Sequence, residues 1–169
     1  MYIITALFMT ILSWKYGDWL NWKKYQSTIL YLIVCDLLYN FLTYNYPLWQ
    51  YVASIMPTHT LNNILVIFVI YPALMLIYLS KFRSTFNLQL VHVLLWACVF
   101  SAIEWSFYKY LDLFTYHNGW NFIWSVLLNI LLFTMVRLHM VRPLLTYVLS
   151  IIFTMAFLIL FHIPINKMK

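Results

Sequence analysis

The stretch ILYLIVCDLLYNFL, residues 29–42, is almost wholly apolar and carries one acid, Asp36, near its centre. The whole chain extends this pattern, because 65% of its 169 residues are hydrophobic and only 8% are charged. Soluble globular domains carry about 25% charged residues. The sequence therefore predicts a polytopic membrane protein with a single helical domain over residues 1–169, and argues against a soluble or nucleic-acid-binding protein.

Six apolar segments follow one another along the chain, whereas a membrane span needs about 20 residues, with about 17–25 tolerated. They cover Tyr2–Trp14, Ser27–Tyr44, Leu61–Leu79, Leu88–Tyr108, Asn121–Val136 and Leu144–Ile163. The first is short unless its helix continues past Lys15. We therefore predict an all-α bundle of six transmembrane helices, or of five if residues 2–14 do not span. Pro72 should kink the third span, because its ring removes one helix hydrogen bond.

Lysines and arginines predict the orientation, because cytoplasmic loops carry an excess of both. The loops after spans one, three and five hold seven: Lys15, Lys23, Lys24, Lys81, Arg83, Arg137 and Arg142. The opposite side holds three: Lys109, Lys167 and Lys169. We therefore predict a multi-pass protein of the cell membrane with its C-terminus outside and with the loops around Pro57 and Asn118 facing out. The N-terminal stretch lacks a basic segment and a cleavage site, so we expect no cleaved signal peptide.

Polar side chains recur at helical spacing within the predicted spans. Residues three, four and seven apart share one face of a helix. The four resulting stripes are Asp36, Tyr39, Asn40 and Thr43; Ser101, Glu104 and Tyr108; Asn118, Asn121, Ser125 and Asn129; and Thr146, Ser150 and Thr154. Stripes turned toward one another predict a pocket in the outer half of the membrane, open on the side of Gly119. The inner half shows little comparable chemistry.

The two acids within the spans, Asp36 and Glu104, need uncharged partners. No lysine or arginine lies at the depth of Asp36, so we expect Tyr, Asn or Ser donors, or a proton shared with Glu104. At least one acid should then be protonated at neutral pH. A structural role for both stays open, although interhelical hydrogen bonds average only about 0.6 kcal/mol. Placing an acid at a helix centre costs about 2.5–3.5 kcal/mol, which favours a functional role.

Aromatic residues make up 21% of the chain, and the two glycines, Gly17 and Gly119, lie outside the predicted spans. An aromatic pocket with embedded acids suits a small hydrophobic or cationic ligand. We expect no metal and no cofactor, because no helix carries an E-x-x-H or H-x-x-x-H pair. Cys35 and Cys98 form no C-x-x-C pair, so we interpret them as small buried hydrophobic residues.

Three stretches carry a resemblance to a known family: TILYLIVCDLLYNFLTYNYPLW, TYHNGWNFIWSVLLNILLF and RLHMVRPLL. They resemble a family of small integral membrane proteins of spore-forming Gram-positive bacteria, over most of the chain after residue 20. The D-x-x-Y-N and Y-H-N-G-W-N elements are its specific motifs. The resemblance implies the topology and a set of candidate residues, namely Asp36, Tyr39, Asn40, Glu104, His117, Asn118, Trp120 and Asn121. It implies no reaction.

Three functions fit these residues. In the first, the protein acts on an isoprenoid or other lipid, with Asp36 or Glu104 as general acid. Ile103-Glu104-Trp105 is similar to the acid-bearing helix of integral membrane terpene cyclases. In the second, the acids hold a cation or carry protons in a transporter or binder. In the third, the protein is a non-catalytic accessory of the spore envelope. The candidate binding residues are Tyr39, Asn40, Thr43, Tyr108, His117, Asn118, Trp120, Asn121, Ser125 and Asn129.

Overall fold

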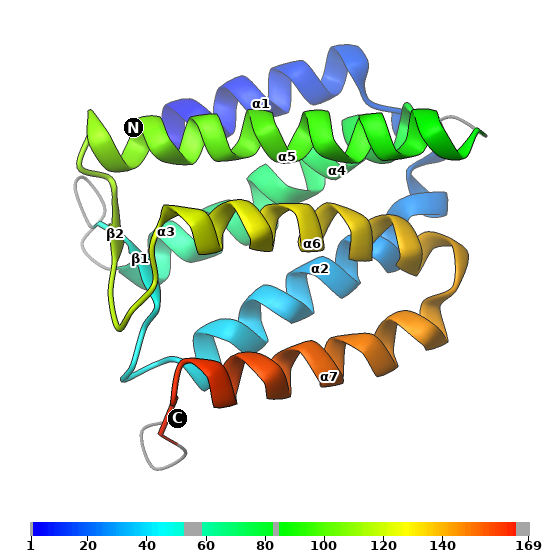
Figure 1. Cartoon of the computed structure of the whole chain (residues 1–169). Helices are drawn as coiled ribbons and strands as arrows, with labels where there is room; N and C mark the ends of the chain where they lie inside the picture. Colours follow the sequence, from blue (N-terminus) through cyan, green and yellow to red (C-terminus); the bar gives the residue numbers. More distant parts are fainter. Residues whose placement is uncertain (1, 53–58, 83–84, 165–169) are drawn as a thin grey trace.

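The computed structural model describes residues 2–52, 59–82 and 85–164, and it confirms the predicted all-α bundle (Figure 1). The helices are α1 (Tyr2–Tyr16), α2 (Trp22–Leu42), α3 (His59–Leu65), α4 (Tyr71–Ser80), α5 (Phe86–Lys109), α6 (Phe122–Val141) and α7 (Pro143–Leu160). A 3-10 turn, Trp19–Asn21, precedes α2. Two short strands, β1 (Trp49–Tyr51) and β2 (Phe114–Tyr116), pair antiparallel, with Gln50 opposite Thr115.

Five helical segments are long and apolar enough to cross a membrane: Trp19–Leu42, Leu61–Ser80, Phe86–Lys109, Phe122–Val141 and Pro143–Leu160. The helix α1 is apolar but has only 15 residues, so it is about 22 Å long at 1.5 Å per residue. It continues past Lys15, as a first span would require, and still falls short of the roughly 30 Å hydrocarbon core. The prediction of six or five spans thus depends on α1.

The third span is one helical segment with an irregular middle. A π-helical turn, Val66–Ile70, joins α3 to α4, and the N–H of Tyr71 bonds to the carbonyl of Val66. Pro72 follows at once. A proline removes one N–H from the helix and its ring crowds the carbonyl four residues back, so the wider turn here accommodates it.

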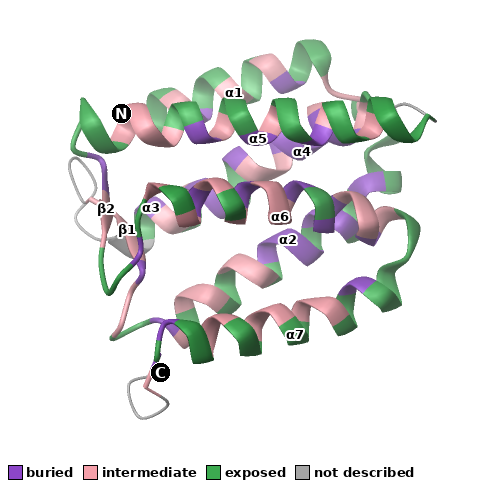
Figure 2. Cartoon of the chain, in the orientation of Figure 1, coloured by how far each residue is buried: buried purple, intermediate pink, exposed green. Residues whose placement is uncertain are grey.

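The helices pack around α2, which contacts both α4 and α6. On one side α1 packs against α4, and on the other α5 and α7 each pack against α6. Buried residues, whose ribbon is purple in Figure 2, include Tyr78 and Phe133, both 0% exposed, at the junction of α4 and α6. The outer faces of α1, α5 and α7 expose large apolar side chains, as expected for surfaces that contact lipid.

The two ends of the bundle differ. One end, which we call the sheet end, holds β1, β2 and the last turn of α7 (Figure 1). The opposite end holds the turns α1–α2, α4–α5 and α6–α7. The β pairing places the segments before α3 and before α6 on the same side, which agrees with the predicted alternation of loops; Pro57 itself lies outside the described residues.

Candidate functional site

A cavity of about 480 Å³ lies inside the bundle, within the roughly 300–1,000 Å³ typical of ligand sites. Residues of α1, α2, α4, α5, α6 and α7 line it, together with side chains of both strands. Its walls are mostly leucine, isoleucine, phenylalanine and other apolar residues. Asp36 and Glu104, the two acids that the sequence places at the centre of the site, both line this cavity.

Glu104, on α5, is held by donors from two other elements. The Tyr116 hydroxyl on β2 donates to Oε1 at 2.7 Å, and Nδ2 of Asn129 on α6 approaches Oε2 at 3.3 Å. The same Nδ2 also donates to Oγ of Ser101 at 3.1 Å. Burial raises the pKa of Tyr116, and the bond to Glu104 raises it further, so this phenol stays neutral and acts as a donor.

Asp36, on α2, has a more local partner. Nδ2 of Asn40 donates to the Asp36 backbone carbonyl at 2.8 Å and lies 3.3 Å from its Oδ2. Nδ2 of Asn63 on α3 donates in turn to Oδ1 of Asn40. Both acids therefore have the uncharged partners that the sequence predicts. In the described part of the chain no hydrogen bond joins the two carboxyl groups. Asp36 and Glu104 therefore do not share a proton through a direct contact.

Tyr71 is a cavity residue that the sequence reasoning missed. It begins α4, directly after the π-helical turn, and it lines the same cavity as Asp36 and Glu104. Its side chain also interacts with that of Tyr51 on β1. A phenol in the same cavity as two carboxyl groups can donate to a ligand held there. No spacing rule identified it, because the π turn shifts the helical phase.

An aromatic cap covers the cavity at the sheet end. The Tyr39 ring stacks on Trp49, with centroids 3.7 Å apart, and Trp49 lies 4.8 Å from Trp120. Nε1 of Trp120 donates to Oγ of Ser125 at 2.8 Å, and Trp120 is only 5% exposed. We expected the pocket to open on the side of Gly119. The residue that follows Gly119 instead packs over the cavity, so this side is covered.

The Tyr39 hydroxyl makes the hydrogen bonds that hold Trp49 of this cap in place. It donates to the Trp49 carbonyl at 3.1 Å and accepts from the N–H groups of Leu48 at 3.2 Å and Trp49 at 3.0 Å. We expect Tyr39→Phe to keep the stacked ring but to destabilise the protein by about 2 kcal/mol, because two buried N–H groups lose their acceptor. The measurement is the free energy of unfolding in mixed micelles. Tyr110→Phe, at a tyrosine that is 72% exposed, is the control. A change in Tyr39→Phe no larger than in this control would contradict the fastening role.

Several predicted binding residues build the cap and its flanking turns. The Thr43 hydroxyl donates to the Tyr39 carbonyl at 2.7 Å, although Thr43 also lines the cavity. Nδ2 of Asn118 donates to the Pro47 carbonyl at 2.7 Å. Oδ1 of Asn121 caps α6 by accepting from the N–H groups of Ile123 and Trp124.

Two further predicted residues lie beside these turns. The N–H of His117 donates to the Leu48 carbonyl at 2.8 Å, and its ring nitrogen is 3.0 Å from the Thr115 hydroxyl. The ring of Tyr108 lies 4.7 Å from that of Tyr116, which bonds to Glu104. Neither residue lines the cavity, and neither do Asn40, Asn118 and Asn121. Of the predicted binding residues, the cavity is lined by Tyr39, Thr43, Trp120, Ser125 and Asn129.

A cluster of polar side chains around one histidine, His139, lies toward the opposite end of the bundle, where we expected little comparable chemistry. His139, 3% exposed on α6, is hydrogen-bonded through Nδ1 to Thr28 at 3.0 Å and through Nε2 to Tyr147 at 3.1 Å. The Tyr31 ring stacks on the imidazole of His139, with ring centroids 4.4 Å apart. The Tyr31 hydroxyl lies 2.7 Å from Oγ of Ser150. The expectation was therefore wrong. The missed signal is that His139 continues the stripe of Ser125 and Asn129 at helical spacing.

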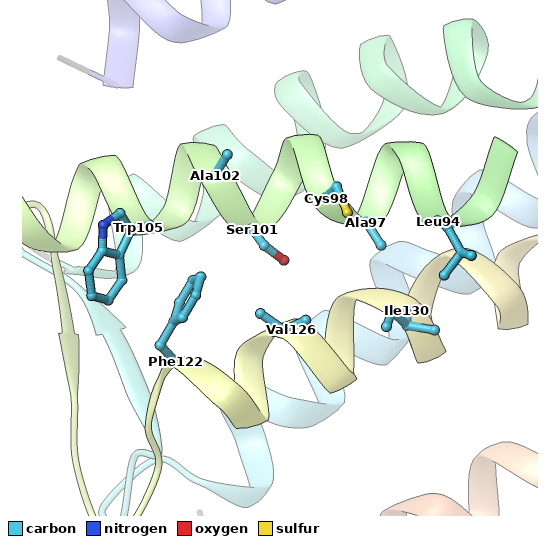
Figure 3. Close-up of a pocket in the computed structure, with 9 residues that line it drawn as sticks. All are labelled: Leu94, Ala97, Cys98, Ser101, Ala102, Trp105, Phe122, Val126 and Ile130. Carbon is cyan, nitrogen blue, oxygen red and sulfur yellow. The ribbon is translucent and has the colours of Figure 1, made fainter. Parts of the chain in front are cut away.

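A second pocket, of about 360 Å³, lies between α5 and α6 (Figure 3). Small side chains of α5, including Ala97, Cys98 and Ala102, form one wall, and Trp105 and Phe122 lie at one end. Cys98 is exposed there and Cys35 is half-buried beside the main cavity, so the prediction that both are buried is wrong for Cys98. This pocket has no titratable group apart from that thiol, so the cavity with the two acids is the candidate site.

The described residues contain no group of three or more histidine, cysteine, aspartate or glutamate side chains placed to hold a metal ion. The polar groups that line the cavity include two carboxyl groups, the phenols of Tyr31, Tyr39, Tyr51 and Tyr71, and the side chains of Ser125 and Asn129. In comparisons with protein-family models, curated proteins and solved structures, none matches this chain.

Proposed function

We propose that this membrane-embedded protein binds a lipid-like molecule, such as an isoprenoid, in the cavity between its helices, and that Asp36 and Glu104 act on its polar group. One observation carries the proposal: two acids with uncharged partners line one apolar, aromatic cavity. An acid at membrane depth is costly and is by default a functional residue. Cavity walls of this kind favour an apolar ligand with few polar groups.

Glu104 is the better candidate for the general acid. Donors fixed by β2 and α6 approach its two oxygens, Tyr116 at Oε1 and Asn129 at Oε2. With both oxygens accepting, a proton carried by Glu104 is free to point into the cavity toward a ligand. Aromatic faces on the wall, such as that of Trp120, would stabilise positive charge that develops after proton transfer.

A transporter or binder of cations is the second candidate. It is favoured by the same acids in their ionised form, because aromatic walls and carboxylates together attract cationic groups. In this form Tyr71 would hydrogen-bond to one carboxylate while the ligand neutralises the pair. A non-catalytic accessory of the spore envelope would use the acids for helix packing alone.

Small molecules that purify with the protein, identified by mass spectrometry after mild detergent extraction, test the proposal. We expect a prenyl or acyl lipid in roughly equimolar amount. Leu128→Trp, which fills the cavity from α6, should displace it. Leu127→Trp, on the neighbouring exposed position of α6, should retain it. A polar metabolite would favour the transporter, and an empty cavity in the wild-type protein would support the accessory role.

We also propose that the sheet end faces outward in the cell membrane, with the C-terminus outside, because lysine and arginine are concentrated at the opposite end. Single cysteines at positions 55 and 117 should react with an impermeant maleimide on intact cells, and one at position 83 only after lysis. Positions 55 and 83 lie outside the described residues, whereas His117 is an exposed residue of the sheet end. The reverse pattern of labelling would invert the orientation.

A further inference from the structure

We propose that the ligand reaches the cavity sideways from the lipid bilayer, through a slot between α2 and α7, and that it is a chain lipid with a neutral or cationic end group. The inference rests on the proposed ligand-binding function and adds the source and class of the ligand. It follows from two observations: buried side chains close both ends of the cavity, and some lining residues on one side are also exposed on the outside of the bundle.

Both ends of the cavity are closed by buried side chains. At the sheet end, Leu48, Trp120 and Ile163 line the cavity and are 2%, 5% and 7% exposed. Toward the opposite end, Tyr31 on α2 is hydrogen-bonded to Ser150 on α7 and is stacked on the buried His139. A ligand arriving from water at either end would have to displace these side chains.

The side of the cavity between α2 and α7 is different. Leu38 on α2 and Ile151 and Met155 on α7 line the cavity, yet they are 43%, 66% and 53% exposed on the outside of the bundle. Residues that meet both the cavity and the surroundings form a thin wall, and at this depth the surroundings are lipid. Both helices pack against α6, and in the described residues the hydrogen bond and the ring contact between them, from Tyr31 to Ser150 and Tyr147, lie at one end of the slot.

The slot has definite limits. Tyr31 and Ser150 join α2 and α7 at one end, and the cap residues that follow Leu42 and Leu158 close the other. From Tyr31 to Leu42, α2 rises roughly 16 Å at 1.5 Å per residue. This opening has the proportions of an extended chain, and the exposed residues that line it, Leu38, Ile151 and Met155, are apolar. An apolar chain can therefore cross it without losing hydrogen bonds to water.

The opposite side of the cavity is a weaker candidate for an entrance. Between α1 and α5, one described cavity residue has a large exposed face, Ile103 at 44%. Thr5 and Met9 on α1 are half-buried there. This side has one such residue, whereas the side between α2 and α7 has three, so the slot between α2 and α7 is favoured as the entrance. Ile103 serves as the comparison position in the test.

The acids restrict the end group of the ligand. An anionic phosphate or carboxylate beside Asp36 and Glu104 would be repelled whenever either acid is ionised, and the described lining residues include no lysine or arginine to compensate. A hydroxyl can bond to either acid in either protonation state, and an ammonium group to an ionised one. A long-chain alcohol therefore represents the class, and a fatty acid of the same chain length is its matched control.

The test uses a long-chain alcohol with a photoactivatable diazirine in mid-chain, delivered from donor vesicles to the full-length protein in liposomes. Samples are illuminated at increasing times after mixing, and cross-linked peptides are located by mass spectrometry. We expect label on cavity residues of α2 and α6. Leu38→Trp and Met155→Trp should slow its appearance by about fivefold or more, as when a gating step becomes limiting. Each rate is expressed relative to the variant's own final level of label, because both side chains also line the cavity.

Two neighbouring substitutions are the controls. Leu37→Trp and Ile152→Trp place the same ring on exposed positions of α2 and α7 that do not line the cavity, and both should label at the wild-type rate. Wild-type rates in the slot variants, or slowing by Ile103→Trp instead, would overturn the slot. Equal cavity labelling by the fatty acid would overturn the end-group assignment. Label confined to lipid-facing residues in the wild-type protein would reject the proposed ligand-binding function itself.

Discussion

Glutamine in place of Glu104 is expected to leave the protein folded and to remove its action on the bound ligand. A glutamine can accept from Asn129 through its oxygen and donate to the Tyr116 hydroxyl through its amide, so both hydrogen bonds survive. Only the titratable proton is lost. General acid catalysis contributes about 10²–10⁴-fold to a rate, so turnover of the co-purified ligand should fall by roughly that factor.

Asparagine in place of Asp36 is the parallel change on α2, because its oxygen can still accept from Asn40. Each variant is measured for melting temperature, ligand affinity and turnover. Binding retained with turnover lost identifies the residue as a proton donor. Affinity reduced by about tenfold or more, at least 1.4 kcal/mol, identifies a carboxylate that holds a cation. If both variants keep full binding and turnover, the acid-centred mechanism is wrong and the acids are parts of the scaffold.

Phe133→Ala is expected to cause the largest loss of stability in the described core. The Phe133 ring is 0% exposed and lies 4.9 Å from Tyr78, 5.5 Å from Phe100 and 6.2 Å from Trp96. Phe→Ala substitutions in soluble cores cost about 3–5 kcal/mol. Lipid is as apolar as the core, so the transfer part is missing here and lost packing dominates. We expect about 3 kcal/mol in the free energy of unfolding, measured by denaturation in mixed micelles.

Ile123→Ala, at a position 70% exposed on the same helix, is the matched control and should change the free energy of unfolding by less than about 0.5 kcal/mol. Phe133→Leu should fall between the two because it leaves a smaller cavity. A loss below about 1 kcal/mol for Phe133→Ala would show that this junction of α4, α5 and α6 collapses around the missing ring, contrary to its tight aromatic packing.

Much of the architecture follows from the sequence because the bilayer leaves few choices. Apolar runs must become helices, and costly acids must face the interior, which places Asp36 and Glu104 on the cavity wall. Helical spacing also relates Ser125 to Asn129, and both line the cavity. Composition and a periodicity of 3.6 residues are sufficient for these features.

Other features depend on contacts between distant segments and could not be predicted. The partner of Glu104 on β2, Tyr116, is supplied by a strand pairing that no local pattern announces. Tyr71 lines the same cavity as the acids, and the π turn directly before it interrupts the regular helical spacing. The cap over the cavity arises because Trp120 packs over it and bonds to Ser125, whereas the sequence predicted a pocket open on the side of Gly119.

The order in which the hydrogen-bond partners of the two acids leave the ribosome has a consequence for membrane insertion. Asn40 follows Asp36 by four residues, so when α2 reaches the translocon the hydrogen-bond donor for its acid is already present on the same helix. Glu104 instead depends on Tyr116 and Asn129, which are synthesised later. The helix α5 therefore reaches the translocon before the hydrogen-bond donors of Glu104 have been synthesised. Its main packing partner in the bundle is α6. Its release into lipid is expected to wait until α6 has emerged, so that the two helices insert as a pair.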